Sequence, residues 1–266
     1  MHEHRASSAS ADAAGDGASR GERLYFWGFV ALASLLVALA VYFTQQRSWI
    51  EDFWVHAAIV RELFAHPLAP SHPLAVGEPA RIPYWPYAVV VATAARLTGV
   101  AAYNALAAMA IANLLLLLVA LRSLARRLYA SEATALFATA LLLLLWGEHP
   151  WLVSGFLHLE VLFYVLSYPS TFAIALTFFA LASFDHYLAA NRARAFAQTL
   201  LLTLAVTLVH ALTAIFLFAG LGAMIWSRHG VARLRPYIDG AAIVAVSCSL
   251  AAVWPYFPLL DATASS

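Results

Sequence analysis

The chain has 266 residues, of which 63% are hydrophobic and 11% charged, and its mean hydropathy is +0.79. Soluble domains of this size do not carry so apolar a composition, and several runs reach the roughly 20 residues that cross a bilayer as a helix. A formal net charge of +1 provides no strong basic field, so nucleic acid is not expected as a partner. We therefore expect an all-α polytopic membrane protein.

The N-terminal residues, 1–22, are rich in Ser, Ala, Gly and Asp. They bury too little apolar surface to fold alone, which predicts a disordered cytoplasmic tail. The apolar run 24–44 is too long for the core of a signal peptide, so we expect a retained membrane-spanning helix. Arg20 and Arg23 flank its start, and the preference of arginine for the cytoplasmic side places the N-terminus inside.

The same preference predicts the topology of the membrane module, residues 23–260. Three arginine groups are expected in the cytoplasm: Arg122, Arg126 and Arg127; Arg192 and Arg194; and Arg228, Arg233 and Arg235. Two apolar stretches, 84–98 and 102–121, precede the first group, and only one of them can span if that group is cytoplasmic. We expect the shorter one, 84–98, to be half-buried or re-entrant on the outer side.

The long apolar stretch 197–226 lies between two arginine groups. As one helix of roughly 30 residues it would run about 45 Å, too long for a tilted span. A hairpin of two short helices that breaks near His210 is the preferred interpretation, although no Gly or Pro marks the break, and one long helix is the alternative. About seven spans result, and the C-terminal tail, 261–266, lies outside; the other spans are 24–44, 102–121, 131–147, 170–189 and 238–257.

Residues 45–83 are the expected first outer loop. Ser48 and Glu51 match the S-x-x-E capping box, in which Ser caps a helix start and Glu returns to the Ser backbone N–H. Asp52 would favour the same helix through the helix dipole, so both carboxylates have a structural interpretation. Asp52 and His56 are four residues apart on one helix face, where the pair can hold a divalent cation or the His can orient the carboxylate.

The expected outer-loop helix is amphipathic. One apolar stripe, typical of a helix lying on a membrane surface, is formed by Ile50, Phe53, Ala57, Val60 and Phe64. Glu62 and His66 continue the polar face of Asp52. A series of prolines then stiffens the loop. Tyr84 and the aromatic residues beside it follow at the expected depth of the lipid headgroups, where they can anchor the protein in the membrane.

Other ionisable side chains are expected near the outer face: Glu148, His149, His158, Glu160 and His210. Such groups at membrane depth are costly and often functional, although loop carboxylates are commonly only solvated and a lone His often bonds another helix. Candidate ligands of a divalent metal are Asp52, His56, Glu148 and Glu160. The metal would neutralise a phosphate leaving group, and a carboxylate could instead act as a general base.

The order of these features resembles the GT-C superfamily of glycosyltransferases, which includes protein O-mannosyltransferases, aminoarabinose transferases and catalytic subunits of oligosaccharyltransferases. The likeness covers most of residues 22–260. It comprises a first span, the acidic pair Glu51–Asp52 at the start of an outer-loop helix, the stretch IPYWPYAVVVATAARLTG, a span ending in RSLARRLYA, and an apolar hairpin bounded by arginines. Members share a seven-span module with an outer-loop helix. They take a sugar from a polyprenyl-phosphate carrier at the outer face.

The resemblance implies roles for the acidic residues. An acidic residue of the first outer loop serves these enzymes as catalytic base or metal ligand, and Asp52 matches that position with Glu51 beside it. Glu148 or Glu160 would match a second acidic position in the next outer loop.

The resemblance also implies how the donor would be held. Arg81 or Arg96 would meet the donor phosphate, and Tyr84 and His210 would be further substrate contacts. The implied partners are a polyprenyl-phosphate-linked sugar, a lipid, glycan or protein acceptor, and the surrounding membrane lipids. The implied location is the bacterial inner membrane.

One departure from the superfamily leaves an alternative open. Members usually continue past the seventh span with more helices or a soluble outer domain, whereas this sequence ends at WPYFPLLDATASS. The alternative is a non-catalytic membrane subunit, a transporter, or a degenerate or truncated partner of such a transferase. Transport would favour ionisable groups deep in several spans and internal repeats, and the expected spans carry few charges.

Overall fold

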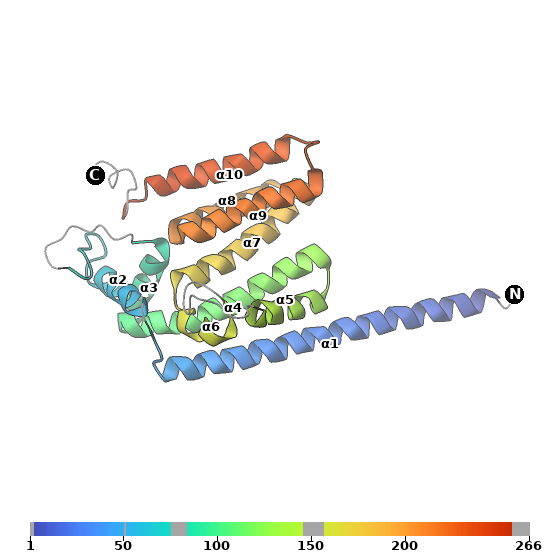
Figure 1. Cartoon of the computed structure of the whole chain (residues 1–266), viewed down its shortest axis with the longest axis horizontal. Helices are drawn as coiled ribbons and strands as arrows, with labels where there is room; N and C mark the ends of the chain where they lie inside the picture. Colours follow the sequence, from blue (N-terminus) through green and yellow to red (C-terminus); the bar gives the residue numbers. More distant parts are fainter. Residues whose placement is uncertain (1–2, 51, 76–83, 146–156, 257–266) are drawn as a thin grey trace.

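A computed structural model describes residues 3–50, 52–75, 84–145 and 157–256, with side chains from Arg20 onward. Within these residues the fold is all-helical and contains no strand (Figure 1). The helices are α1 (Glu3–Gln45), α2 (Phe53–Ala65), α3 (Pro86–Thr98), α4 (Ala102–Tyr129), α5 (Glu132–Leu144), α6 (Leu159–Val165), α7 (Pro169–Ala190), α8 (Ala193–Val209), α9 (Ala211–His229) and α10 (Arg235–Ala252).

Four of the described helices are long and apolar enough to cross a membrane: α1 from Arg20 onward, α4, α7 and α9. The chain is therefore an all-α integral membrane protein. Each of the other expected spans also coincides with a helix, but α5 has 13 residues and α8 has 17. At 1.5 Å per residue these two rise about 20 and 25 Å, less than the ~30 Å of a hydrocarbon core. Seven complete spans are thus not established.

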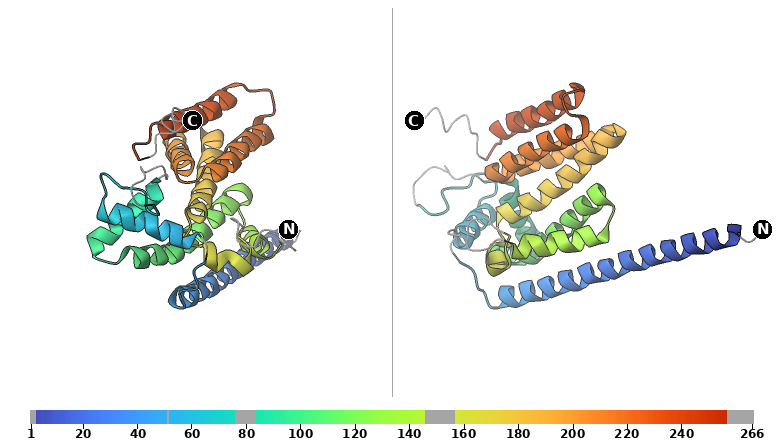
Figure 2. Two further views of the ribbon diagram at one scale, coloured as in Figure 1. Left: turned by 60° about the vertical axis from the view of Figure 1, so that its left-hand side comes forward. Right: turned by 45° about the vertical axis from the view of Figure 1, so that its right-hand side comes forward.

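The long helices run roughly side by side, so the bundle has two ends (Figure 1). One end holds α2, α3 and the starts of α4, α7 and α9, and we call it the α2–α3 end. In Figures 1 and 2, α1 lies along one side of the bundle, near α4, α5 and α6, while α10 lies on the other side with α8 and α9. The first residues of α1 project beyond the bundle at the opposite end.

Arginines gather at that opposite end, which we call the arginine end. Glu132 accepts a hydrogen bond from Arg122 Nε at 2.9 Å and is also paired with Arg126. Asp185, only 1% exposed, accepts from Arg127 Nε at 2.6 Å and from Arg228 Nε at 2.8 Å. The last turns of α4 and α9 are thereby tied to α7. Arginines from separate groups share one end, as the expected topology requires, and the membrane face that this end meets stays a prediction.

The predicted break at His210 is confirmed. α8 ends at Val209, α9 begins at Ala211, and His210 between them is extended, with φ −156° and ψ 102°. Its Nδ1 accepts a hydrogen bond from Thr213 N at 3.3 Å and lies 2.8 Å from Thr213 Oγ1. The imidazole thus caps α9 in the way that Asp or Ser side chains usually do. No Gly or Pro is needed to start the new helix, because the cap satisfies one of its free N–H groups, that of Thr213.

The predicted capping box at Ser48 is wrong as a helix start. α2 begins at Phe53, and the Ser48 N–H donates to Phe43 O of α1 instead. Tertiary contacts prevail over the local signal here. The Trp49 ring stacks on Phe53 at 4.5 Å, and the Tyr168 hydroxyl donates to Ile50 O at 2.9 Å. Together they hold the segment before α2 in a non-helical conformation.

The apolar face of α2 packs against protein, namely α3 and α4. Its buried residues are Phe53, Ile59, Val60 and Leu63, so the predicted stripe is correct at Phe53 and Val60. The expected position of this helix on a membrane surface stays a prediction. α3 covers most of the stretch 84–98, and its 13 residues are too few to span, which agrees with the non-spanning interpretation.

The loop that is expected to lie outside, residues 45–83, is held by several hydrogen bonds. Glu62 Oε1 accepts from Ser71 N at 2.9 Å and from Ser71 Oγ at 2.8 Å, and His66 Nδ1 lies 2.9 Å away. From the far end of the chain, Trp254 Nε1 donates to Tyr84 O at 2.8 Å and Tyr256 OH donates to Pro67 O at 2.8 Å. The segment after α10 therefore holds the loop against the bundle.

At the N-terminus the structure differs from the expected disorder. α1 starts at Glu3, so most of residues 1–22 continue the first helix (Figure 1). Alanine is frequent in this stretch, and it is the residue with the highest intrinsic helix propensity. The expected outer tail, 261–266, lies outside the described residues.

Candidate functional site

Asp52 stands at the start of α2, on the α2–α3 end of the bundle, and its side chain is exposed. The residues on either side of the acidic pair are fixed. Ile50 is held by the Tyr168 hydroxyl, and Phe53 is fully buried beneath Trp49. Asp52 is therefore exposed although its described neighbours in the chain are fixed. Glu51 itself lies outside the described residues.

His56 follows one turn later, and its backbone N–H donates to Asp52 O at 2.9 Å. Its ring is half-buried between two aromatic rings, with centroids 5.2 Å from Tyr168 and 6.0 Å from Trp85. The Nδ1 atom is buried and has no hydrogen-bond partner among the described residues. Burial lowers the pKa of His56 to about 4; the Asp52 carboxylate opposes this shift and the nearby His210 adds to it.

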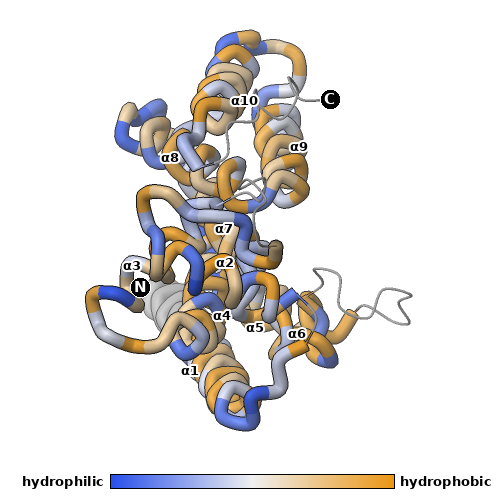
Figure 3. The backbone as a smooth tube through the Cα atoms, turned by 90° about the vertical axis from the view of Figure 1, so that its left-hand side faces the viewer, coloured by the Kyte–Doolittle hydropathy of each residue, from blue (hydrophilic) through white to orange (hydrophobic). Residues whose placement is uncertain are grey.

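His210 approaches this place from the junction of α8 and α9. It is close enough to His56 for the two charges to interact. Because His210 Nδ1 accepts the Thr213 N–H, the proton of the neutral ring lies on Nε2. An N–H donor is thus available at the α2–α3 end. Figure 3 looks onto this end, where hydrophilic segments occupy the connections and hydrophobic ones follow the helices.

Two distant parts of the sequence thus meet in one place, because the start of α2 supplies Asp52 and His56 and the junction of α8 and α9 supplies His210. The structure adds Tyr168 and Trp85, which enclose the His56 ring. Both had only weak sequence signals, since Trp85 reads as a membrane anchor and Tyr168 as an ordinary loop residue. Each directly precedes a proline that begins a helix, and such a residue is held in an extended conformation. That signal would have marked both as residues with a restricted backbone.

Two of the residues predicted to contact substrate, Tyr84 and Arg96, form hydrogen bonds with the protein itself. Tyr84 is fully buried, its hydroxyl donates to Ser71 O, and burial raises its pKa to about 12. Arg96 Nη1 donates to Phe64 O at 2.6 Å, near the end of α2. Both side chains hold the loop in place in this structure. Arg81 lies outside the described residues.

The predicted metal ligands are brought together only in part. Asp52 and His56 are neighbours, Glu160 is exposed in the first turn of α6, and Glu148 lies outside the described residues. Among the side chains that the structure describes, no three His, Cys, Asp or Glu residues are grouped to hold a metal ion. Two ligands are fewer than the usual metal site needs, so the divalent metal stays a prediction and the chemistry proposed below uses side chains alone.

The shifted pKa of His56 predicts a pH-dependent stability. Because the folded pKa of about 4 lies below the ordinary 6.5, the unfolded chain binds a proton between these values that the folded protein does not. The free energy of unfolding should therefore fall by on the order of 2 kcal/mol as the pH drops through this window. Unfolding in detergent at pH 7 and pH 4.5 measures the loss. His56→Gln should reduce it, and an equal loss in both proteins contradicts the prediction.

Comparisons with known proteins add no relative to these observations. No protein-family model matches the sequence, and searches of curated proteins and of solved structures find no match. The class that the described residues define is thus a helical integral membrane protein, with Asp52, His56 and His210 at one end and the arginines of the last turns of α4 and α9 at the other.

Proposed function

We propose that the protein is a membrane glycosyltransferase that moves a sugar from a polyprenyl-phosphate carrier to an acceptor at the α2–α3 end. One observation carries the proposal: Asp52 and His56 at the start of α2 gather with His210, from the distant junction of α8 and α9, at the end opposite the three arginine groups. The arginine end would face the cytoplasm, which makes the α2–α3 end the outer, periplasmic one. The membrane would be the bacterial inner membrane, with the N-terminus inside.

In this proposal Asp52 is the general base. Its carboxylate takes the proton of an acceptor hydroxyl while the hydroxyl oxygen bonds to the anomeric carbon of the sugar. The bond from that carbon to the phosphate oxygen breaks, and polyprenyl phosphate leaves with the electron pair. Exposure of Asp52 lets an acceptor approach from water, and the fixed backbone around it reduces the entropy lost in positioning.

The neutral state of His56 supports the same role. With a pKa of about 4, its imidazole is uncharged near pH 7 and forms no ion pair with Asp52. The carboxylate then remains free to accept a proton. The proton on His210 Nε2 is suited to bond an oxygen of the donor phosphate, which is the substrate contact expected for that residue.

A transfer assay tests the proposal. The full chain is reconstituted in vesicles with a panel of polyprenyl-phosphate sugars and with lipid, glycan or peptide acceptors, and released polyprenyl phosphate is measured. We expect release that requires both the chain and an acceptor, and a chelator arm reports whether a divalent metal takes part. Binding of a donor without release would favour the alternative of a non-catalytic subunit or a partner of another transferase.

A further inference from the structure

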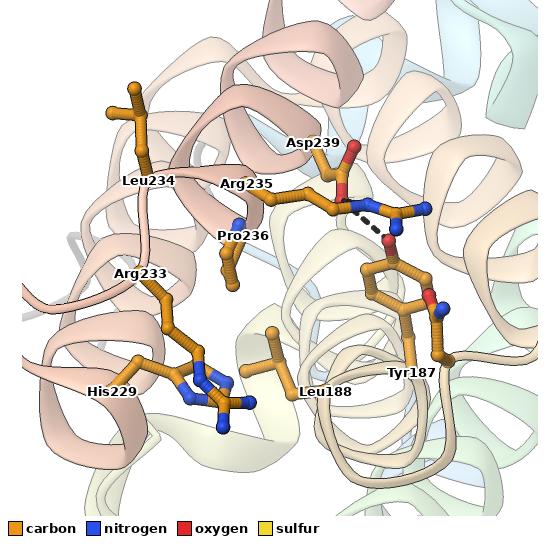
Figure 4. A pocket seen from close by; sticks show the side chains of 9 residues that line it. Tyr187, Leu188, His229, Arg233, Leu234, Arg235, Pro236 and Asp239 are labelled. Carbon is orange, nitrogen blue, oxygen red and sulfur yellow. Dashed lines mark hydrogen bonds and ion pairs between the residues drawn. The ribbon is translucent and has the colours of Figure 1, made fainter.

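A second polar site lies at the arginine end, remote from Asp52. A cavity of about 420 Å³ opens between the last turns of α7 and α9 and the first turn of α10 (Figure 4). This volume falls in the range of small-molecule sites. Nothing in the proposed transfer reaction uses this cavity, because that reaction takes place at the other end of the bundle.

The cavity is lined by basic and apolar side chains. Figure 4 shows His229 and Arg233 directed toward the same space beside Leu188. Leu234 and Pro236 add further apolar surface. The site therefore offers a guanidinium and an imidazole next to hydrocarbon, which is the combination that a phosphate ester with an apolar portion requires.

The charges in the cavity are not balanced by the protein. Asp239 accepts a hydrogen bond from Tyr187 OH at 2.6 Å, and Arg235 Nε lies 3.8 Å from the same carboxylate. Arg233 is exposed and has no ion-pair partner among the described residues. One guanidinium is thus left to bind a ligand.

We propose that this cavity binds a phosphate group, either the headgroup of an acidic phospholipid or a soluble phosphate ester. The predicted topology places it at the cytoplasmic surface, where acidic lipids concentrate negative charge. Leu234 is 72% exposed at its rim, and Val231 nearby is 81% exposed. Exposed apolar residues beside a cationic cavity suit a ligand whose phosphate enters the cavity while its chains remain in the bilayer.

The test uses the full chain in an uncharged detergent, titrated with dihexanoyl phosphatidylglycerol, dihexanoyl phosphatidylcholine and glycerol 3-phosphate. We expect Arg233→Gln to weaken binding of the anionic lipid about tenfold, since a charge-assisted contact is lost. Arg194→Gln is the matched control, because Arg194 is exposed at the same end and lies outside the cavity. That variant should bind within about twofold of the parent.

Each outcome of the titrations either tests the proposal or identifies the source of the phosphate group. Equal losses in the two variants, or no loss in Arg233→Gln, would overturn the proposal, as would equal binding of the zwitterionic lipid. Binding of glycerol 3-phosphate with the same dependence on Arg233 identifies a soluble phosphate ester. Binding of the anionic lipid alone identifies a phospholipid headgroup. A thermal melt of each variant confirms that the change lies in binding and not in folding.

Discussion

Replacing Asp52 with Asn is expected to reduce sugar transfer at least 100-fold, because a general base typically accelerates transfer by 10²–10⁴. Asn keeps the size of the side chain and its ability to accept a hydrogen bond, but it cannot take the acceptor proton. Since the side chain is exposed, the thermal stability should remain near that of the parent. The measurement is the initial rate of polyprenyl-phosphate release, together with a melt in detergent.

The matched control is Glu62→Gln. It removes a carboxylate from the same helix, and the amide oxygen can still accept the hydrogen bonds from Ser71. Ser71 donates to Glu62 and so lowers its pKa, which places this carboxylate in a structural role. We expect transfer within a few-fold of the parent. Full activity of Asp52→Asn would remove the assignment of the base, and equal losses in both variants would indicate that only net charge matters.

Replacing Asp185 with Asn is expected to destabilise the folded protein by about 2 kcal/mol, which corresponds to a melting temperature roughly 4–8 °C lower. Asp185 is 1% exposed and joins Arg127 of α4 to Arg228 of α9. A neutral amide cannot balance two guanidinium charges. Its NH₂ group is itself a hydrogen-bond donor and would face the N–H donors of the arginines. The loss stays below the usual range for a broken buried pair because the two arginine side chains remain 34% and 39% exposed to water.

Asp239→Asn provides the comparison for Asp185. The Asp239 side chain is 25% exposed, and its ion pair with Arg235 spans 3.8 Å, so the pair contributes little. An amide oxygen can still accept the Tyr187 hydroxyl. Thermal melts of the two variants in the same detergent should therefore differ clearly. Similar melting temperatures would show that the contact with Arg127 and Arg228 is not a main tie between the helices.

The helices could be predicted from composition because their signal is local and repeated. Apolar length alone placed α4, α7 and the break at His210, the last of these because one unbroken helix would have been too long. The start of α2 could not be predicted in this way. It depends on Tyr168 reaching Ile50 across 118 residues, a contact that prevails over the sequence pattern at Ser48.

The ionisable residues of the candidate site could be predicted from the sequence, but the aromatic residues around them could not. Asp52 and His56 are linked by helical spacing, and topology places His210 at the same end. The enclosure of His56 by Trp85 and Tyr168 depends on how the starts of α3 and α7 pack against α2, for which the sequence has no periodic signal. Tyr84 reads as a membrane anchor, but Trp254 and Ser71 bind it from 170 and 13 residues away.

The hydrogen bonds that Trp254 and Tyr256 donate to Tyr84 and Pro67 have a consequence for biogenesis. Their partners, Tyr84 and Pro67, leave the ribosome some 170 and 189 residues earlier. The carbonyl groups of Tyr84 and Pro67 therefore lack these two donors until the segment after α10 has been synthesised. A nascent chain halted before Trp254 would keep the contacts of Ile50 with Tyr168 and of Phe64 with Arg96 but lack these two, so the full set of contacts at this end depends on synthesis of residues 254–256.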